Sequence, residues 1–285
     1  MNVKYTKALL RAHGLRPNKR LGQHFLVDPT AAEKIVAAAQ IKPDETVLEV
    51  GPGLGALTRI LLQHARQVIA VEVDERLCAI LIGELRDQPA FRLINEDFLD
   101  LDLHGLAQQA GEDGLKIVGN LPYHITGQSV RMILDHMHLL RGAVITVQRE
   151  VANRIVASPG GKTYGVLSVA AQYLSRPKLL LHLGKEAFYP QPQIASTVVT
   201  LVPRLEPPIR VNDEAFFFTV VRALFGHRRK MARNALRTHP HIRLKNDDLG
   251  ELFRRTQIDL GRRAETMSLE ELGLLCNVLG KLRHV

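Results

Sequence analysis

The tetrapeptide Asn120-Leu121-Pro122-Tyr123 combines an amide with an aromatic ring directly after an apolar stretch, Leu115 to Gly119. An asparagine side chain offers one carbonyl acceptor and two N–H donors but no proton-abstracting base at neutral pH, and a tyrosine ring offers a flat face for stacking. Together they suit a site that holds an exocyclic amine of a planar base. Asn and Pro are also common turn residues, so a purely structural turn is the alternative.

A glycine loop, Gly51-Pro52-Gly53-Leu54-Gly55, follows the apolar run Val47 to Val50 and leads into a helical pattern. Glycines allow the backbone to approach a ligand closely and to adopt positive φ. Gly51, Gly53 and Ala56 also fit the Gly-x-Gly-x-x-Ala dinucleotide fingerprint. The loop indicates a nucleotide-containing ligand at the end of this strand, although a glycine loop alone is weak support.

Two carboxylates follow the next two apolar runs. Glu72 lies 21 positions after Gly51, where it could accept hydrogen bonds from both hydroxyls of a ribose. Asp97 is placed to accept from an adenine amino group beside the ring of Phe98. The pair predicts an adenosine pocket, with NAD and S-adenosylmethionine equally compatible at this point. Either acid taken alone could be a solvated strand-end residue.

Alternating strand and helix patterns position these groups. Short β-branched runs predict strands at Thr46 to Val50, Val68 to Val73, Phe91 to Asn95, Leu115 to Gly119 and Ala143 to Val147. Helical patterns cover Thr30 to Gln40, Ala56 to His64, Glu75 to Arg86, Gly127 to Met137 and Glu150 to Ala157. Asp28 and Pro29 are a typical helix start. The alternation predicts a doubly wound α/β fold, with ligands at the carboxyl ends of its strands.

The pattern changes in the last third of the chain. Lys178 to Leu183 and Thr197 to Val202 predict two further strands, paired like a hairpin at one edge of the sheet. Prolines then interrupt the periodicity, and from Asp213 onward the chain is mostly helical. We therefore expect a domain boundary near Leu205, with an α/β domain over 1–205 and a smaller helical domain over 206–285.

The charge favours a polyanionic partner. The chain holds 38 Lys and Arg against 29 Asp and Glu, a net charge of +9. Residues 203–263 carry 14 of the basic and 7 of the acidic residues, and the N-terminal arm, 1–27, carries six basic residues and no acid. A cluster on one predicted helix should contact RNA phosphates, a solvated helix face being the alternative; it contains Arg228, Arg229, Lys230, Arg233 and Arg237.

Several classes of protein are disfavoured. No apolar stretch is long enough to cross a bilayer. The basic arm lacks an apolar secretory segment, and it leaves little room for a removable leader before Gly22. Cys78 and Cys276 lack metal-ligand spacing, which predicts reduced packing residues in a cytoplasmic protein. The histidines near the basic cluster lack a matching Cys or carboxylate group, so no metal site is predicted.

These motifs, in this order, resemble those of the KsgA (RsmA) family of small-subunit rRNA adenine N6-dimethyltransferases over nearly the whole chain. The segments that carry the resemblance are Leu21 to Leu26, Glu49 to Thr58, Glu72, Glu96-Asp97, Asn120 to Tyr123, Tyr164 to Val169 and Phe188 to Pro192. The resemblance implies a Rossmann-like class I methyltransferase domain with an all-helical C-terminal domain, and S-adenosyl-L-methionine as the cofactor.

The resemblance also implies site roles. Cofactor contacts would come from His24, Leu26, Gly51, Gly53, Glu72, Asp97 and Asn120. The reaction would involve Asn120, Pro122, Tyr123 and Phe188, with the two aromatic rings on either side of the target base. Two departures from the family pattern stand out: His24 replaces the more frequent Asn, and Gln193-Ile194-Ala195 replaces Lys-Val-Asp.

The resulting hypothesis is that the Asn120 side-chain oxygen and the Pro122 carbonyl accept the two N6 hydrogens of adenine. The resemblance implies dimethylation of two adjacent adenosines in a loop near the 3′ end of 16S rRNA, within an immature small ribosomal subunit, by a monomer. The alternatives are an Erm-like large-subunit rRNA methyltransferase, a noncatalytic ribosome-assembly factor of the same fold and, from the glycine loop alone, an NAD-dependent dehydrogenase.

Overall fold

The β-branched runs of the sequence form one seven-stranded sheet in the computed structural model, which describes residues 1–111, 114–227, 229–242, 244 and 246–282. The strands are β2 (Thr46–Val50), β3 (Gln67–Glu72), β4 (Phe91–Asn95), β5 (Leu115–Asn120), β6 (Leu140–Gln148), β7 (Ser175–Leu183) and β9 (Ser196–Pro203). Their order is β4-β3-β2-β5-β6-β9-β7. The pairs from β4 to β6 are parallel, and β9 is antiparallel to both β6 and β7. The predicted sheet and its edge pair are confirmed.

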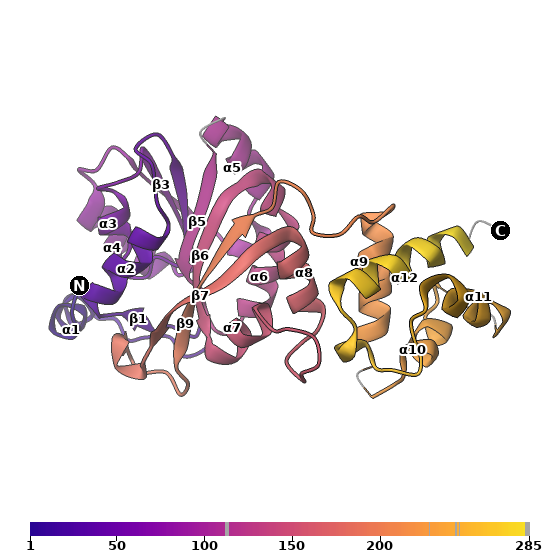
Figure 1. Cartoon of the computed structure of the whole chain (residues 1–285). Helices are drawn as coiled ribbons and strands as arrows, with labels where there is room; N and C mark the ends of the chain where they lie inside the picture. The colour runs from indigo at the N-terminus through magenta and orange to yellow at the C-terminus, as the bar shows by residue number, and fades with distance from the viewer. Residues whose placement is uncertain (112–113, 228, 243, 245, 283–285) are drawn as a thin grey trace. The chain divides into compact units, whose positions relative to one another are not determined.

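Helices lie on both sides of this sheet, as a doubly wound fold requires (Figure 1). They are α2 (Pro29–Ala38), α3 (Thr58–Leu61) and α4 (Glu75–Leu85) on one side and α5 (Leu103–Ala110) and α6 (Thr126–Asp135) on the other, and α7 (Arg149–Ile155) follows β6. Short 3-10 turns cover Phe98–Asp100, Met137–Leu139 and Lys185–Ala187. The Asp28 side chain caps α2 by accepting from the Ala31 N–H, as predicted.

The basic N-terminal arm contains a helix that the sequence patterns did not predict. Val3–Ala12 forms helix α1, whose first turn is capped by the Asn2 side chain. Leu9 and Leu10 lie on one face of α1 and pack in a buried cluster with side chains of the glycine loop and α4. The strongly basic composition of the arm does not indicate this helix, because its two leucines are a small part of the segment.

The arm then continues into the short strand β1 (Phe25–Leu26), which pairs antiparallel with β8 (Phe188–Tyr189). This two-stranded sheet joins two segments that carried the family resemblance but lie far apart in the sequence. It places His24 and the segment that follows Phe188 in one neighbourhood.

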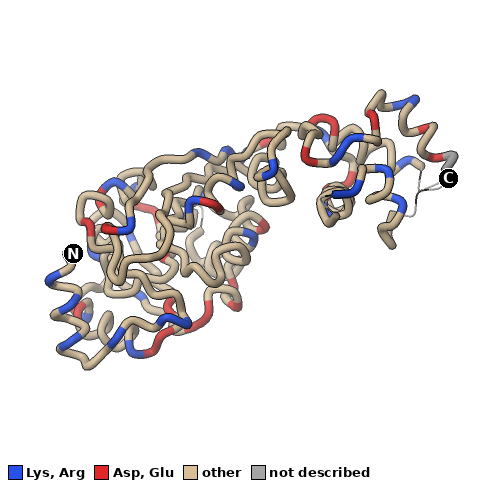
Figure 2. The backbone as a smooth tube through the Cα atoms, turned by 90° about the horizontal axis from the view of Figure 1, so that it is seen from below, with Lys and Arg blue, Asp and Glu red and all other residues tan. Residues whose placement is uncertain are grey.

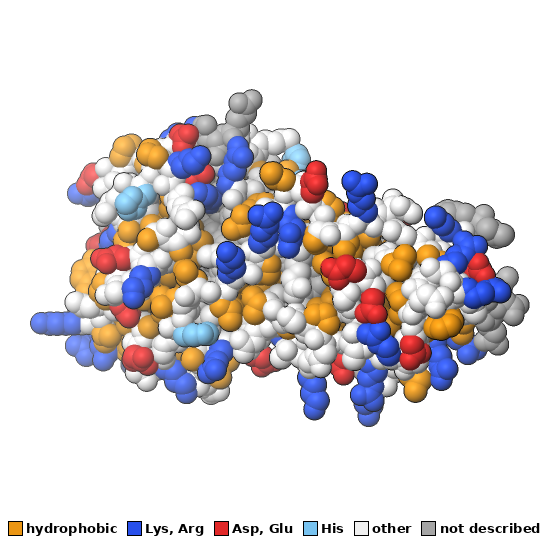
Figure 3. Space-filling view, viewed as in Figure 1, with side chains coloured by type: hydrophobic (Ala, Val, Ile, Leu, Met, Phe, Trp, Pro, Cys, Tyr) orange, Lys and Arg blue, Asp and Glu red, His pale blue; other side chains and the backbone are white. Residues whose placement is uncertain are grey.

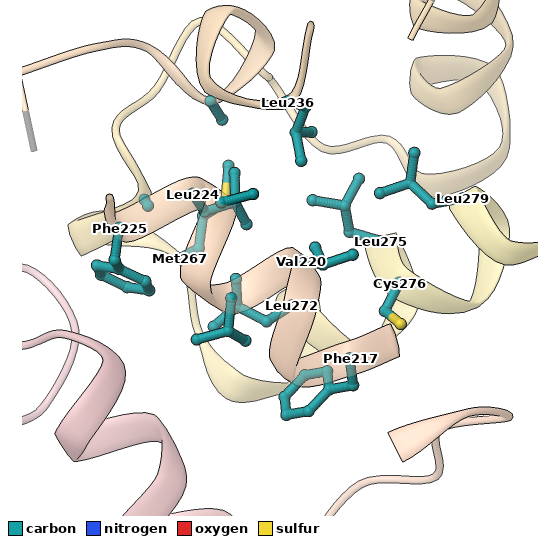
Figure 4. Close-up of a cluster of buried hydrophobic side chains, with 14 of the residues drawn as sticks. Phe217, Val220, Leu224, Phe225, Leu236, Met267, Leu272, Leu275, Cys276 and Leu279 are labelled. Carbon is teal, nitrogen blue, oxygen red and sulfur yellow. The ribbon is translucent and has the colours of Figure 1, made fainter. Parts of the chain in front are cut away.

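The chain divides into two units: Met1–Ala152 with Ser175–Pro203, and Asn153–Leu174 with Arg204–Val285. The second unit contains α8 (Val166–Leu174), α9 (Glu214–Phe225), α10 (Ala232–Thr238), α11 (Asn246–Thr256), a 3-10 turn (Ala264–Thr266) and α12 (Leu269–Leu282). Phe217, Val220 and Leu275 are among its fully buried side chains (Figure 4). The helical composition predicted after Asp213 is confirmed.

The division differs from the predicted one at residues 153–174, which the sequence pattern assigned to the first domain. Tyr164, Val169 and Tyr173 are buried in the same cluster as Phe217. The rings of Tyr173 and Phe217 lie 5.1 Å apart. This apolar face could not be assigned from periodicity, because an amphipathic helix indicates that one of its faces is buried but not against which partner.

Within the described ranges, no helix is both long and apolar enough to span a membrane. In the same part of the chain, no three His, Cys, Asp or Glu side chains are grouped as a metal site would require. Cys78 and Cys276 are free and buried, and burial raises the pKa of their thiols to about 11 and about 12. Both side chains therefore pack as small apolar groups.

The carboxyl ends of β2 and β5 approach each other closely at Gly119. A Cβ atom at this position would lie 2.5 Å from the Val50 carbonyl oxygen and 3.1 Å from the Val50 Cβ. Both neighbours belong to a strand that is hydrogen-bonded on both sides and has little room to move. Glycine is therefore required at position 119 by the backbone of the next strand.

We expect Gly119→Ala to destabilise the protein by about 1 to 3 kcal/mol, because the added methyl group must displace a central strand. The measurement is thermal unfolding by calorimetry, with a fall in Tm of several degrees. Gly83→Ala is the matched control, since Gly83 lies on α4 with open space around it. That change should stabilise the helix by up to about 1 kcal/mol. An unchanged Tm for Gly119→Ala would contradict the close-approach argument.

Candidate active site

A pocket lies at the carboxyl ends of the parallel strands, where the predicted site residues meet. Its wall contains residues that follow four different strands, among them Gly51 after β2, Glu72 at the end of β3, Asp97 after β4 and Asn120 at the end of β5. Because these strands are parallel and adjacent, their carboxyl ends share one edge of the sheet. Residues 21–25 of the N-terminal segment also line the pocket.

The glycine loop has the backbone conformation that its composition predicted. Gly51 and Gly53 have φ values of 66° and 58°, in the left-handed region that favours glycine. A Cβ atom at Gly53 would meet the Phe25 ring at 3.0 Å, and one at Gly51 would lie 3.5 Å from the Asn120 carbonyl oxygen. Both glycines line the pocket with bare backbone.

Glu72 is 7% exposed and held in place by two backbone groups. Its Oε2 atom accepts from the Gly53 N–H at 3.2 Å, and its Oε1 atom accepts from the Asp74 N–H at 3.0 Å. Burial raises the pKa of Glu72, against the lowering effect of the Asp74 and Gly53 N–H groups. Each oxygen retains a further lone pair that a ligand hydroxyl can donate to.

Asp97 also lines the pocket, at the start of the turn Phe98–Asp100. Its Oδ1 atom accepts from the Leu99 N–H at 2.9 Å, which fixes the orientation of the carboxylate. The side chain is half-buried, and the buried Phe98 ring lines the same wall. This is the combination of acceptor and apolar surface that recognition of an adenine edge requires.

The Asn120 side-chain amide has one hydrogen-bonded atom, Nδ2, and one atom without a partner among the described residues, Oδ1. Its Nδ2 atom donates to the His24 carbonyl oxygen at 2.9 Å. Its Oδ1 atom is buried and, among the described residues, has no hydrogen-bond partner. A buried acceptor without a partner is disfavoured by about 1 to 3 kcal/mol, so this atom marks a position where a ligand donor would be stabilising.

The Tyr123 ring lies beside His24 at the pocket. The two ring centroids are 5.1 Å apart, with an angle of 37° between the planes. The Nδ1 atom of His24 is 2.7 Å from the Pro190 carbonyl oxygen. Because a carbonyl can only accept, Nδ1 carries the proton, and the second nitrogen of a neutral His24 is an acceptor.

Two of the predicted reaction residues differ from expectation. The Pro122 carbonyl oxygen already accepts from the Ile125 N–H at 3.2 Å and from the Thr126 hydroxyl at 2.9 Å. Both of its lone pairs are therefore used inside the chain, and the prediction that it also accepts an N6 hydrogen is not supported. The carbonyl instead closes the turn that leads into α6.

Phe188 does not reach the pocket. It is 2% exposed and packs in a buried cluster with Leu26 and Val198. A ring in this position cannot stack on a base without leaving its cluster, so only Tyr123 of the predicted pair is available for stacking. Leu26 is also buried, and it lines a smaller cavity next to the glycine loop, together with His24 and Asn120. The pairing of β1 with β8, which a sequence pattern does not show, buries both side chains.

The predicted RNA-contacting residues belong to the second unit. Arg229, Lys230, Arg233 and Arg237 are exposed on α10 and the turn before it, and Arg228 lies outside the described residues. Both signs of charge occur along the backbone of this unit (Figure 2), and basic side chains project from the surface in the space-filling view (Figure 3). The basic residues of this unit differ in whether they form an ion pair with an acidic side chain.

Three other arginines of this unit are paired with acids: Arg254 and Arg255 with Glu251, and Arg262 with Glu271. No such partner occurs for the four described residues around α10, within the ranges that the structure covers. The uncompensated positive charge of this unit therefore includes α10 and its preceding turn.

One acidic residue of the site was not singled out from the sequence. Glu49 is 1% exposed in β2, lines the smaller cavity beside the glycine loop, and has an Oε2 atom without a hydrogen-bond partner in the described part of the chain. Burial raises the pKa of Glu49 to about 8, with Thr58 opposing and the Glu72 carboxylate adding to the rise. A carboxylate inside an otherwise apolar strand is the signal that could have identified it.

Glu49 predicts a pH dependence of stability. The folded-state pKa of Glu49 lies above the ordinary value of 4.5, because the buried side chain favours its protonated form. The stability that this proton contributes is therefore fully present below about pH 4.5 and is lost as the pH rises through about 8. The slope is at most about 1.4 kcal/mol per pH unit. We expect Glu49→Gln, which cannot ionise, to gain stability relative to the unchanged protein across this window, measured as Tm against pH. Glu33→Gln on the exposed face of α2 is the control. A pH-independent difference in Tm for Glu49→Gln would contradict the assignment.

Comparisons with known proteins agree with this geometry. Residues 14–275 match the family model described as ribosomal RNA adenine dimethylase. Two relatives, each named ribosomal RNA small subunit methyltransferase A, come from Geobacillus sp. (strain WCH70) and Alkaliphilus oremlandii (strain OhILAs). The first is 38% identical and covers 96% of this chain and 95% of its own; the second is 39% identical and covers 98% and 97%.

Two solved structures share the fold over most of the chain. The 23S rRNA methyltransferase ErmE has a TM-score of 0.69 at 25% identity, covering 90% of this chain and 99% of its own. A dimethyladenosine transferase from Plasmodium falciparum has a TM-score of 0.71 at 20% identity, covering 91% and 98%. The family match spans both units and every pocket-lining segment described above. The chain therefore belongs to the ribosomal RNA adenine dimethylase family.

Proposed function

We propose that this protein uses S-adenosyl-L-methionine to dimethylate the N6 amines of two adjacent adenosines in a loop near the 3′ end of 16S rRNA, acting as a cytoplasmic monomer on an immature small ribosomal subunit. Family membership makes it an rRNA adenine dimethyltransferase. The small-subunit target is supported by the two relatives named small subunit methyltransferases, which are 38% and 39% identical to this chain. The identity to the 23S rRNA methyltransferase ErmE is lower, at 25%.

The observation that carries the proposal is the open Oδ1 atom of Asn120. It is a buried acceptor without a partner among the described residues, in a side chain that lines the same pocket as Glu72 and Asp97. An exocyclic adenine amine is a donor that could satisfy it. The bond from Nδ2 to the His24 carbonyl fixes which amide atom faces the ligand.

The residues present fit S-adenosylmethionine. The bare backbone of Gly51 and Gly53 leaves room for a ligand beside the loop, and Glu72 has lone pairs left for the ribose hydroxyls. The Oε2 atom of Glu49, which has no hydrogen-bond partner among the described residues, lies beside the loop and suits the cationic amino group of the cofactor. Asp97 would accept from its adenine amine. When bound, the cofactor supplies an electrophilic methyl group on its sulfonium.

Orientation of the amine is the main task of the protein groups. The adenine N6 lone pair is delocalised into the ring, so the amine is a weak nucleophile in its free state. A hydrogen bond to the Asn120 oxygen would hold the amino group, while the Tyr123 ring would stack on the purine. Positioning of this kind lowers barriers by up to about 7 to 11 kcal/mol in favourable systems. No general base is required, because the proton can leave to water after transfer.

RNA binding would extend from the pocket by charge. A base must leave its stack to enter such a pocket, which favours a single-stranded loop over a duplex interior. Lys19 and Arg20 are exposed immediately before the pocket-lining residue Leu21. They would contact phosphates beside the target base, and the unpaired residues of α10 would contact phosphates elsewhere on the RNA.

The decisive assay uses purified protein, labelled S-adenosylmethionine, and small or large ribosomal subunits that lack the modification. We expect label only in small-subunit RNA, as N6,N6-dimethyladenosine at two adjacent positions. In the same assay Asn120→Ala should lose about 100-fold or more in turnover, with a smaller change in cofactor affinity measured by calorimetry.

Asn277→Ala is the matched control, since the Asn277 side chain bonds to backbone groups at Arg210 and Asn212 in the second unit and lines no part of the pocket. It should retain turnover. Label confined to large-subunit RNA would show the Erm-like activity instead, and near-normal turnover of Asn120→Ala would remove the proposed role of its side chain.

The basic residues of α10 predict a salt dependence of RNA binding. Arg233→Ala and Arg237→Ala should each reduce the slope of log affinity against log salt by about 0.7 to 0.9, the value for one lost phosphate contact. Arg262→Ala should leave the slope unchanged, because Glu271 pairs with that side chain and with no second arginine among the described residues. The measurement is RNA binding at several salt concentrations. Equal slopes for all three variants would contradict phosphate contacts at α10.

A further inference from the structure

The Tyr123 hydroxyl has a specific partner that the sequence motifs did not identify. Its Oη atom lies 2.6 Å from the Oγ atom of Ser196, a short hydrogen bond in which either group can donate. Ser196 is 0% exposed, whereas Tyr123 is half-buried. One end of the proposed stacking ring is therefore bonded inside the protein, and the rest remains accessible at the pocket.

Ser196 is a rigid anchor. It is the first residue of β9 and pairs with Gln148 of β6 on one side and with Leu183 of β7 on the other. The carbonyl of the preceding residue, Ala195, accepts from the Arg149 N–H at 3.0 Å. The hydroxyl therefore belongs to a residue whose backbone is held by two neighbouring strands.

Tyr123 has much less support of its own. It lies between the end of β5 at Asn120 and the start of α6 at Thr126, in a turn outside both elements. Its remaining ring contact among those described is with His24, which is itself held by the Pro190 carbonyl. Without a bond at the hydroxyl, the ring could swing about its side-chain torsions.

We infer that Ser196 is a positioning residue for the target base, because its hydroxyl fixes the orientation of the Tyr123 ring before the base arrives. The inference rests on the proposed function, in which that ring stacks on adenine beside Asn120. A ring that is already ordered loses less conformational freedom on binding and presents its face at the angle that the reaction needs. Ser196 itself touches neither the cofactor nor the base.

The two hydroxyls must then act as a unit, which a double-mutant cycle measures. The variants are Ser196→Ala, Tyr123→Phe and the two combined, with Ser196→Thr as the variant that keeps a hydroxyl. Ser129→Ala is the control, because Ser129 is also fully buried in the first unit but its hydroxyl has no hydrogen-bond partner within the described residues. Initial rates are measured on unmethylated small subunits, and cofactor affinity is measured by calorimetry.

We expect Ser196→Ala and Tyr123→Phe each to lower kcat by about 2- to 10-fold, the range for one lost hydrogen bond. The double variant should show the same loss and not the product of the two. Cofactor affinity and the KM for subunits should stay near those of the unchanged protein, and Ser196→Thr should recover most of the rate. Tyr123→Phe tests the same bond if Ser196→Ala fails to fold.

Multiplicative losses in the double variant, or unchanged rates in both single variants, would overturn the inference. So would a fall in cofactor affinity that matches the fall in rate, since that would indicate general damage to the pocket. An unchanged protein that methylates no small-subunit adenine would instead overturn the proposed function itself. The rate of the unchanged protein therefore separates the two failures.

Discussion

The close approach of β2 and β5 at their carboxyl ends is the constraint on which the site depends. Gly119 has no room for a side chain because the Val50 carbonyl lies where its Cβ atom would be. One residue further along each strand, the backbone of Gly51 faces the Asn120 carbonyl across a gap that would just admit a methyl group. The glycine loop and the Asn120 amide are therefore neighbours through the packing of their backbones.

The site also holds polar groups that folding alone does not satisfy. The Asn120 Oδ1 and Glu49 Oε2 atoms are buried without a partner in the described residues, and burial raises the pKa of Glu49 to about 8. Each such atom reduces stability by about 1 to 3 kcal/mol. Both residues line the smaller cavity beside the glycine loop, and a ligand with an amine at each position would remove both penalties. The protein is thus less stable than it would be with apolar residues at these positions. The same two acceptors favour binding of a ligand that can donate a hydrogen bond to each.

Much of the first unit could be predicted from the sequence because local rules decide it. Strand periodicity, the Asp28 cap and the glycine loop depend on residues within a few positions of one another. Other features depend on partners far along the chain. The burial of Phe188 follows from the pairing of β1 with β8, and the placement of residues 153–174 follows from packing against α9. The folded state of the N-terminal arm similarly requires α4 and the glycine loop.

The sequence by itself determined the order of the strands and helices along the chain, the two carboxylates that follow neighbouring strands, the chemical nature of Asn120 to Tyr123 and the clustering of positive charge. Only the tertiary structure decided which of these groups are free to act. It left the Asn120 oxygen open, used both lone pairs of the Pro122 carbonyl, removed Phe188 from the pocket and tied Tyr123 to Ser196. The physical reason is that residue type sets what a group can bond to, whereas its three-dimensional neighbours decide whether that capacity is already used.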